Sequence, residues 1–393
     1  MEKIKLLLKA FYKIPLLIPT WNDTESAIAV YNSNISETTS EDLRKAIKKL
    51  YKVKYAYDFN LGRSSIQIAL RSFGLRPNDE VILSTYSCKG VIEPIIREKL
   101  KPILVDMDDN FNISPKSIEE NITNKTKVII MSHLYGHPAQ IDEILSIAKK
   151  HKLYVIDDAA QVVGLKYNNK MVGTFGDVGI LSFGIGKSLS ATGGGMLITN
   201  NKDIADIVNL NWLMSIEDKE DRVIPYWKEF YSRKYTAPFY LVINRFKKRK
   251  DWKIKKMSPI DCALILLQLN KLDNIIEERR KIAESYFKLL NNIRLILPNN
   301  DKGNIFTKYV VIIKSYQDEI QLSRYLRLHR IETETNYKPL HLYPEYSQYK
   351  RTSLSRAEVI YNKVLTIPNY KLTLCDRRYV SHTIKQFFMK DEQ

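Results

Sequence analysis

The chain has 393 residues, of which 44% are hydrophobic and 27% charged, so it is long enough for two or three domains around a large core. Its three cysteines are widely spaced, odd in number and form no CxxC pair, which argues against a disulfide framework or a zinc site and fits a reducing cytosol. The net charge of +18 attracts polyanions, but the lysines are spread along the chain and no DNA- or RNA-reading motif is present. We expect a cytoplasmic globular protein without a specific nucleic-acid partner.

The first 21 residues are basic and apolar and superficially resemble a secretion signal. Lys9 and Lys13 interrupt the apolar run, however, and no small-x-small cleavage site follows. We interpret this segment as a docking arm or short helix. No stretch of the chain reaches the roughly 18 consecutive apolar residues that a membrane span needs.

Between residues 60 and 200, short apolar runs rich in β-branched residues alternate with amphipathic segments. This alternation predicts a mostly parallel sheet covered by helices on both faces, with ligands bound beyond the carboxyl ends of the strands. The predicted strands are 80–84, 102–106, 127–132, 153–157, 179–183 and 195–199, and the helices between them include 64–73, 90–100 and 141–152.

The pattern changes in the second half, where apolar residues recur every three to four positions over 262–292 and predict one long helix. A strand at 308–314, a helix at 318–330, an extended segment at 331–337 and helices at 355–365 and 375–388 are expected to follow. The sequence thus predicts an N-terminal arm with helices (1–44), a large α/β domain (45–261), and a connecting helix with a small α+β domain (262–393).

Lys187 stands in a glycine-rich turn, SFGIGKSLSATGGGMLITN (182–200), where a lysine is unusual. A phosphate-binding P-loop is excluded, because Leu181 occupies the position that needs its first glycine. Two interpretations stay open from the local sequence. The lysine stem packs while the amine reaches solvent, or the amine is desolvated and forms a Schiff base with a cofactor aldehyde.

Two more segments favour the second interpretation. VIDDAAQVVG (155–164) is a strand ending in two acids, and pyridoxal phosphate needs a carboxylate at its pyridine nitrogen. FNLGRSSIQIAL (59–70) is a glycine turn running into a helix, whose N-terminal amides suit a phosphate. Gly62, Ser64 and Ser65 fit an ordinary N-cap equally well. Together, the three segments favour a pyridoxal phosphate site.

The run DDAAQVVGLKYNNKMVGTFGDVGILSFGIGKSLSATGGGMLIT (157–199) resembles the signature of the DegT/DnrJ/EryC1/StrS family. The similarity extends over roughly residues 45–390. Members are fold-type-I, pyridoxal-phosphate-dependent aminotransferases that act on nucleotide-linked keto sugars. The resemblance therefore implies an α/β large domain with a smaller α+β C-terminal domain.

The resemblance also implies roles for individual residues. Lys187 would form the Schiff base with the cofactor and move the proton between Cα and C4′. Asp158 would pair with the pyridine nitrogen, Gln161 would lie near the phenolic oxygen, and Asp157 would be a neighbouring structural acid. The phosphate would be surrounded by Gly62, Arg63, Ser64 and Ser182.

Three positions depart from the family pattern. Arg63 stands where the family has a threonine; it keeps its backbone N–H and can add a charge, but it is bulkier. Cys88 aligns with the ring-stacking aromatic residue, so either Tyr86 covers the ring or the stacking is weaker. The family's Asn-x-Arg element, contributed by the partner subunit, aligns with residues 254–256, and its amide is missing. Lys255 or Lys256 is the candidate substitute.

Because dehydratase relatives carry histidine at the lysine position, Lys187 implies amino transfer. The resemblance implies L-glutamate as donor, a nucleotide-diphosphate keto sugar as acceptor, a role in cell-surface polysaccharide biosynthesis, and a homodimer with its active sites at the interface. The basic cluster 244–256 is either a surface loop or faces the partner's site and holds the substrate diphosphate. Segment 236–250 either touches a membrane peripherally or packs in the dimer. The alternative function is a cofactor-binding but catalytically diverged regulator or scaffold.

Overall fold

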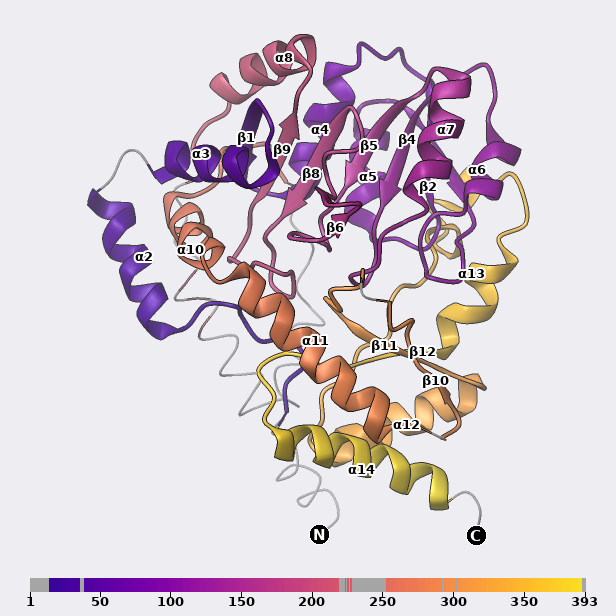
Figure 1. Cartoon of the computed structure of the whole chain (residues 1–393). Helices are drawn as coiled ribbons and strands as arrows, with labels where there is room; N and C mark the ends of the chain where they lie inside the picture. Colours follow the sequence, from indigo (N-terminus) through magenta and orange to yellow (C-terminus); the bar gives the residue numbers. More distant parts are fainter. Residues whose placement is uncertain are drawn as a thin grey trace.

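The computed structural model contains a large unit built on a seven-stranded sheet and a smaller unit below it in the view of Figure 1. Residues 1–13 of the predicted arm, the whole of 236–250 and the basic cluster up to residue 251 lie outside the described residues. The structure describes residues 14–35, 39–218, 223, 225, 227, 252–291, 293–301 and 303–390.

The large sheet has the strand order β1-β9-β8-β5-β4-β2-β3. Strands β3, β2, β4, β5 and β8 run parallel, and β9 is antiparallel to both β8 and β1, which confirms the predicted mostly parallel sheet. The six predicted strands lie within one residue of the observed ones, whereas β1 was not predicted, since its buried Asp58 is a residue depleted in strands. The strands are β1 Tyr55–Phe59, β2 Glu80–Ser84, β3 Lys101–Val105, β4 Thr126–Ser132, β5 Tyr154–Asp158, β8 Val178–Ser182 and β9 Gly195–Thr199, with a small hairpin of β6 Lys166–Tyr167 and β7 Lys170–Met171.

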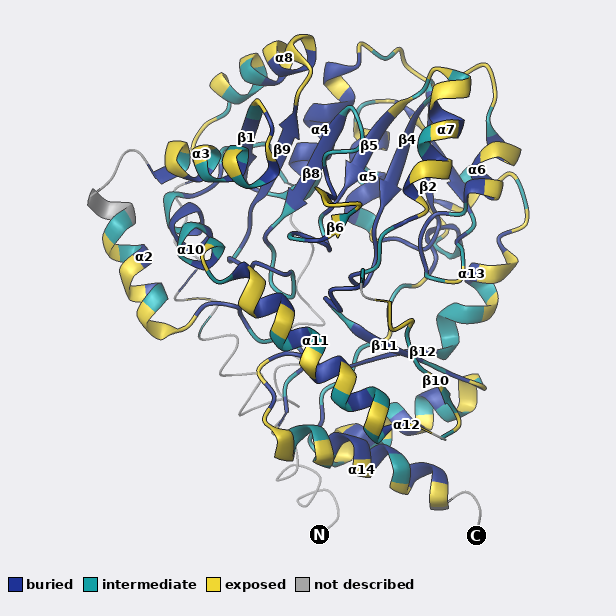
Figure 2. Ribbon diagram, viewed as in Figure 1, coloured by how far each residue is buried: buried dark blue, intermediate teal, exposed yellow. Residues whose placement is uncertain are grey.

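Helices cover both faces of this sheet (Figures 1 and 2). Along β4, Val128 and Ile130 pack into the core on one face, and Ile129 and Met131 pack into the core on the other. Alternation of this kind is expected for a strand that is buried on both sides. The first core is covered by α4 Gly62–Ser72, α5 Lys89–Arg97 and α8 Lys202–Leu213, and the second by α3 Thr39–Tyr51, α6 Pro115–Asn121, α7 Ile141–His151 and α10 Pro259–Leu269.

The long helix predicted over 262–292 is wrong, because the structure has two helices there, α10 and α11 Leu272–Leu289. The helix breaks at Lys271, whose amide bonds to the carbonyl of Gln268 and whose φ/ψ of −115°/12° is not helical. Helix α10 packs on α3 and on α2 Asp23–Ile35, whereas α11 runs on toward the small unit (Figure 1). Apolar residues keep their spacing of three to four positions through the break, so the sequence pattern does not indicate it.

The small unit is a three-stranded antiparallel sheet, β10-β11-β12, packed against helices. The helix predicted over 355–365 ends early, because Val364 and Leu365 pair with β11 instead. Its elements are β10 Leu295–Ile296, β11 Tyr309–Ile313, α12 Tyr316–Leu328, α13 Ser355–Ile360, β12 Val364–Ile367 and α14 Leu374–Lys390, with short 3₁₀ turns at Leu340–Leu342, Ser347–Tyr349 and Tyr361–Lys363.

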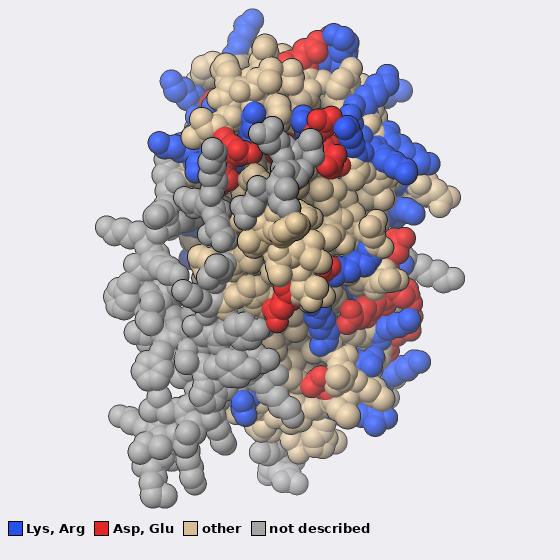
Figure 3. Space-filling model, turned by 90° about the vertical axis from the view of Figure 1, so that its left-hand side faces the viewer, with Lys and Arg blue, Asp and Glu red and all other residues tan. Residues whose placement is uncertain are grey.

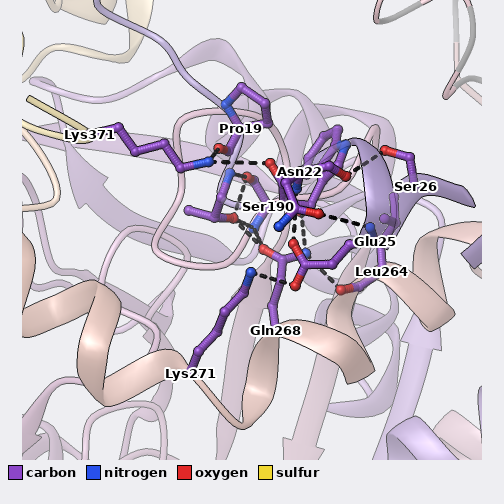
Figure 4. Close-up of polar contacts among 11 residues, drawn as sticks. Pro19, Asn22, Glu25, Ser26, Ser190, Leu264, Gln268, Lys271 and Lys371 are labelled. Carbon is purple, nitrogen blue, oxygen red and sulfur yellow. Dashed lines mark hydrogen bonds and ion pairs between the residues drawn. The ribbon is translucent and has the colours of Figure 1, made fainter. Parts of the chain in front are cut away.

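The segment of chain that precedes α2 is hydrogen-bonded to the loop between β8 and β9 (Figure 4). The side-chain amide of Gln268 donates to the carbonyl of Ser190 at 2.8 Å, and the Thr20 amide donates to the Ser190 hydroxyl at 3.0 Å. Lys371, from the small unit, donates to the carbonyl of Pro19 at 2.9 Å. The segment before α2 and helix α10 thus hold the loop that carries Lys187, and the small unit in turn holds that segment.

Candidate active site

A cavity of about 250 Å³ lies where the carboxyl ends of β4, β5 and β8 meet the N-terminus of α4. This is the position at which a mostly parallel sheet binds its ligands. The structure brings seven of the predicted site residues together in its wall: Gly62, Arg63, Cys88, Asp158, Gln161, Ser182 and Lys187. The cavity is not lined by Ser64, Tyr86, Lys255 or Lys256.

Lys187 reaches this cavity from the loop that connects β8 to β9. The loop turns at Gly186, whose φ of +87° is a conformation that residues with a side chain rarely adopt. Burial lowers the pKa of the Lys187 amine, while the neighbouring Cys88 and Asp158 oppose that shift. A lowered pKa increases the fraction of the neutral amine, the form that can act as a nucleophile or a base.

Asp158 ends β5 and presents its carboxylate to the same cavity. Its Oδ2 accepts a hydrogen bond from the Ser132 hydroxyl at 2.9 Å, and its Oδ1 accepts one from the Ala160 amide at 3.1 Å. Burial raises the pKa of Asp158, and these hydrogen bonds and the charge of Lys187 counteract the shift. In its ionised form, Asp158 can stabilise a positive charge in the cavity.

The adjacent acid, Asp157, is fully buried and points into the protein. It accepts hydrogen bonds of 2.8 Å from His133 Nε2 and from the amides of Gly173 and Phe175. Since His133 Nδ1 accepts the Ala139 amide, Nε2 must carry the proton. His133 also lines the cavity and was missed by the sequence analysis, although its place directly after β4 is a signal for a site residue.

Gln161 links the cavity to the small unit. Its side-chain oxygen accepts the Tyr135 amide at 3.3 Å, and its nitrogen donates to the Tyr337 hydroxyl at 3.1 Å. The rings of Tyr135 and Tyr337 are nearly parallel, with centroids 6.3 Å apart. The two units therefore position this side chain jointly.

The N-terminus of α4 lies directly against the ends of β8 and β9. A Cβ on Gly62 would come within 3.1 Å of Ser182 Cβ, and one on Gly195 would come within 2.5 Å of the Gly62 backbone. The ordinary N-cap interpretation fails, because the cap residue is Leu61 and makes no side-chain cap bond. Ser64 donates to Asn60 Oδ1 at 2.9 Å instead of facing the cavity.

Two of the predicted cofactor contacts need correction. Arg63 lines the cavity, but its guanidinium donates to Glu93 at 2.8 Å, so a carboxylate of the protein already balances the charge that it could add at the phosphate. Tyr86 is fully buried, and its hydroxyl lies 3.1 Å from that of Tyr135 and contacts the carbonyl of Asn336. This aromatic packing holds Tyr86 outside the cavity wall, and Cys88 occupies the wall in its place.

Lys255 and Lys256 are held by their own chain. Lys255 Nζ lies 3.2 Å from the carboxylate of Asp218, and Lys256 Nζ lies 3.9 Å from the centre of the Trp212 ring. Neither therefore reaches the cavity described above. The predicted contact with a partner subunit's site stays a prediction.

The surface carries mixed charge. In Figure 3, Lys and Arg side chains gather along the edges of the face, with Asp and Glu among them. Within the described part of the chain, none of the helices combines the length and the apolar character that crossing a membrane requires.

Comparison with known proteins identifies the family. The sequence profile of the DegT/DnrJ/EryC1/StrS aminotransferase family matches residues 22–385. The chain belongs to this family. It is 32% identical to a "pleiotropic regulatory protein" of Geobacillus stearothermophilus over 86% of both chains, and 29% identical to the GDP-perosamine synthase of Escherichia coli O157:H7, again over 86% of both.

Solved structures of low sequence identity share this fold. PseC of Helicobacter pylori, an aminotransferase involved in pseudoaminic acid biosynthesis, is 20% identical, with a TM-score of 0.81 over 96% of this chain and 99% of PseC. The E. coli GDP-4-keto-6-deoxy-D-mannose-3-dehydratase, solved with bound hydrated pyridoxal phosphate, is 20% identical, with a TM-score of 0.79 over 96% of this chain and 100% of the dehydratase. These similarities confirm the predicted fold-type-I architecture.

Proposed function

We propose that the protein is a pyridoxal-phosphate-dependent aminotransferase that moves an amino group from L-glutamate to a nucleotide-linked keto sugar. The observation that carries this proposal is a buried lysine amine with a lowered pKa in the same cavity as a strand-end carboxylate. The family membership and the amino-sugar enzymes among its relatives support the substrate class. The product would serve cell-surface polysaccharide biosynthesis.

The cavity fits pyridoxal phosphate. Gly62 lets the α4 N-terminus lie against Ser182, and helix amides of this kind bind phosphate. Within the same first turn, the hydroxyl of Ser65 is buried without a partner among the described residues. Asp158 at the other end suits a protonated ring nitrogen. Gly62, Ser182, Asp158 and Gln161 would therefore hold the cofactor, with the backbone amide of Arg63.

When bound, the cofactor supplies an aldehyde carbon and a ring that accepts electrons. Lys187 would hold the cofactor at that carbon through its neutral amine, and the amine would move a proton between Cα of the donor and C4′. Asp158 would hold a proton on the ring nitrogen through its negative charge. Gln161, fixed by Tyr135 and Tyr337, would orient the ring through its phenolic oxygen.

The acceptor side of the site would be completed by a second copy of the chain. In a homodimer with C2 symmetry, the 252–257 segment of each subunit would lie at the interface, and Lys255 and Lys256 would bind the substrate diphosphate. The double variant Lys255→Gln/Lys256→Gln should raise the KM for the sugar nucleotide and leave the glutamate half-reaction unchanged. A defect on the glutamate side would contradict this assignment. A cytoplasmic location fits the three unpaired cysteines.

The first test is an absorbance spectrum of the protein with pyridoxal phosphate, recorded before and after L-glutamate is added. Wild type should show the visible band of the lysine-bound cofactor, and glutamate should convert it to the pyridoxamine form. Lys187→Ala should show neither. No such band in wild type, or one that survives Lys187→Ala unchanged, would reject the proposal.

A second candidate is a regulator or scaffold that keeps the cofactor fold without the reaction. The relative named as a pleiotropic regulatory protein and the departures at Arg63 and Cys88 favour it. It predicts a wild-type spectrum with the cofactor band that no amino donor converts. The donor screen should therefore include L-glutamate, L-glutamine and L-aspartate.

A further inference from the structure

Residues 252–257, where the described chain resumes, lie along the N-terminus of α4. Asn60, two residues before Gly62, is the centre of this contact. Its amide donates to the carbonyl of Lys255 at 2.9 Å, its side-chain nitrogen donates to the carbonyl of Lys253 at 3.0 Å, and its side-chain oxygen accepts the Lys255 amide at 3.3 Å. We call residues 252–257 the return segment.

Asn60 also connects the return segment to the cavity wall. Its side-chain oxygen accepts the hydroxyl of Ser64 in the first turn of α4, and its carbonyl accepts the amide of Gly194 at 2.8 Å. A Cβ on Gly194 would come within 2.3 Å of Met257, the last residue of the return segment. The return segment, the α4 N-terminus and the Gly194 loop therefore form one packed unit at this end of the cavity.

Two arginines clamp the first residue of the return segment. The guanidinium of Arg63 lies 5.1 Å from the centre of the Trp252 ring, and that of Arg97 lies 4.5 Å from it. Arg97 also donates to the carbonyl of Trp252 at 2.6 Å, and Arg63 is oriented by its 2.8 Å bond to Glu93. Such cation–π contacts are attractive, and they strengthen as the pair is desolvated.

We propose that Arg63 is a positioning residue that clamps Trp252 and thereby holds the return segment, and through Asn60 the phosphate-binding amides of α4, in place. Arg63 would thus act on the phosphate through the backbone rather than with its charge, which Glu93 already balances. The family threonine at this position has no guanidinium and cannot form this clamp. The inference rests on the proposed function, because it takes the α4 end of the cavity as the phosphate site.

The test compares a ligand that has the phosphate with one that lacks it. Dissociation constants of pyridoxal phosphate and pyridoxal would be measured from the lysine-bound absorption band in wild type, Arg63→Thr and Trp252→Ala. Both variants should weaken pyridoxal phosphate binding by about tenfold, as for other residues that position a ligand contact, and change pyridoxal binding little. Trp252→Phe keeps an aromatic face and should restore most of the affinity.

Arg71→Thr is the matched control. Arg71 lies on α4 about two turns from Arg63 and pairs with Glu98 at 2.9 Å, so its loss removes an Arg–Glu pair from the same helix without touching Trp252. Thermal unfolding of every variant identifies any that fail to fold.

The outcomes separate the two proposals. If wild type forms no band with either ligand, the proposed function fails. If wild type binds pyridoxal phosphate more tightly than pyridoxal but folded Arg63→Thr keeps the same preference, or loses affinity for both ligands equally, the clamp is overturned.

Discussion

The two ends of the cavity differ in the groups that they present to a ligand. At the strand end, Lys187 and Asp158 present groups whose pKa values are shifted by burial and by each other. At the α4 end, the side chains of Arg63 and Ser64 are bonded to Glu93 and Asn60, and the proposed phosphate contacts are the backbone amides of Gly62 and Arg63. Under the proposed function, reactivity is concentrated at the strand end, whereas the α4 end acts as a scaffold.

This difference has a counterpart in the departures from the family pattern. The residues that the resemblance assigns to the chemistry, Lys187, Asp158 and Gln161, are unchanged, and all three line the cavity. Arg63 departs at the α4 end, where a new side chain can be accommodated if the backbone stays in place. A change at the strand end should therefore affect rates, and a change at the α4 end should affect binding or stability.

The largest expected effect is on the rate of the glutamate half-reaction in Asp158→Asn. Loss of the negative charge at the ring nitrogen should lower this rate by on the order of 100-fold or more, as for other groups that stabilise developing charge. Single-turnover stopped-flow absorbance measures it. A rate within a few-fold of wild type would contradict the assignment of the reactive groups to the strand end.

Asp157→Asn changes the neighbouring acid and should lower the stability of the protein rather than the reaction rate. The substitution places an amide donor among partners that are themselves donors, His133 Nε2 and the amides of Gly173 and Phe175. Leaving such buried groups unpaired costs about 1–3 kcal/mol each, so the free energy of unfolding should fall by roughly 2–3 kcal/mol. Urea unfolding measures this loss. A rate defect as large as that of Asp158→Asn, without a stability loss, would contradict the structural role.

At the α4 end, Gly194→Ala should cost stability and cofactor affinity but not the rate of the bound complex. Gly194 has a φ of +107°, and an added Cβ would collide with Met257. Such strain costs about 1–3 kcal/mol. Thermal unfolding measures the loss of stability, and pyridoxal phosphate titration measures the loss of affinity. Gly74→Ala is the control, since Gly74 also has a positive φ but open space around it. Equal losses in both variants would show that the close approach to Met257 is unimportant.

The smallest expected effect is a shift in a pH profile. Only the neutral amine of Lys187 captures an aldehyde, so the capture rate should rise with pH and level off above the Lys187 pKa. Because burial lowers that pKa from 10.5, the midpoint of the profile should lie below pH 10.5. Asp158 raises the pKa, so Asp158→Asn should move the midpoint to lower pH, whereas Arg63→Thr should leave it in place. A shift in Arg63→Thr would sharpen the comparison by showing that the two ends are coupled.

Much of the fold and the strand end could be predicted from the sequence. The β-rich runs, the two acids of 157–158 and the glycines around Lys187 are local patterns, and strand and turn preferences are encoded locally. They place six strands of the sheet within one residue. The parallel order then brings Lys187, Asp158 and Gln161 to the same edge without further information.

What only the tertiary structure decided depends on partners far away in the chain. Arg63 pairs with Glu93, and Tyr86 packs in an aromatic cluster with Tyr135. Val364 pairs with β11 as a strand residue instead of ending the predicted helix. None of these contacts leaves a local pattern in the sequence. The sequence by itself determined which residues carry reactive groups, and long-range packing decided which of them face the cavity and which are held by the protein.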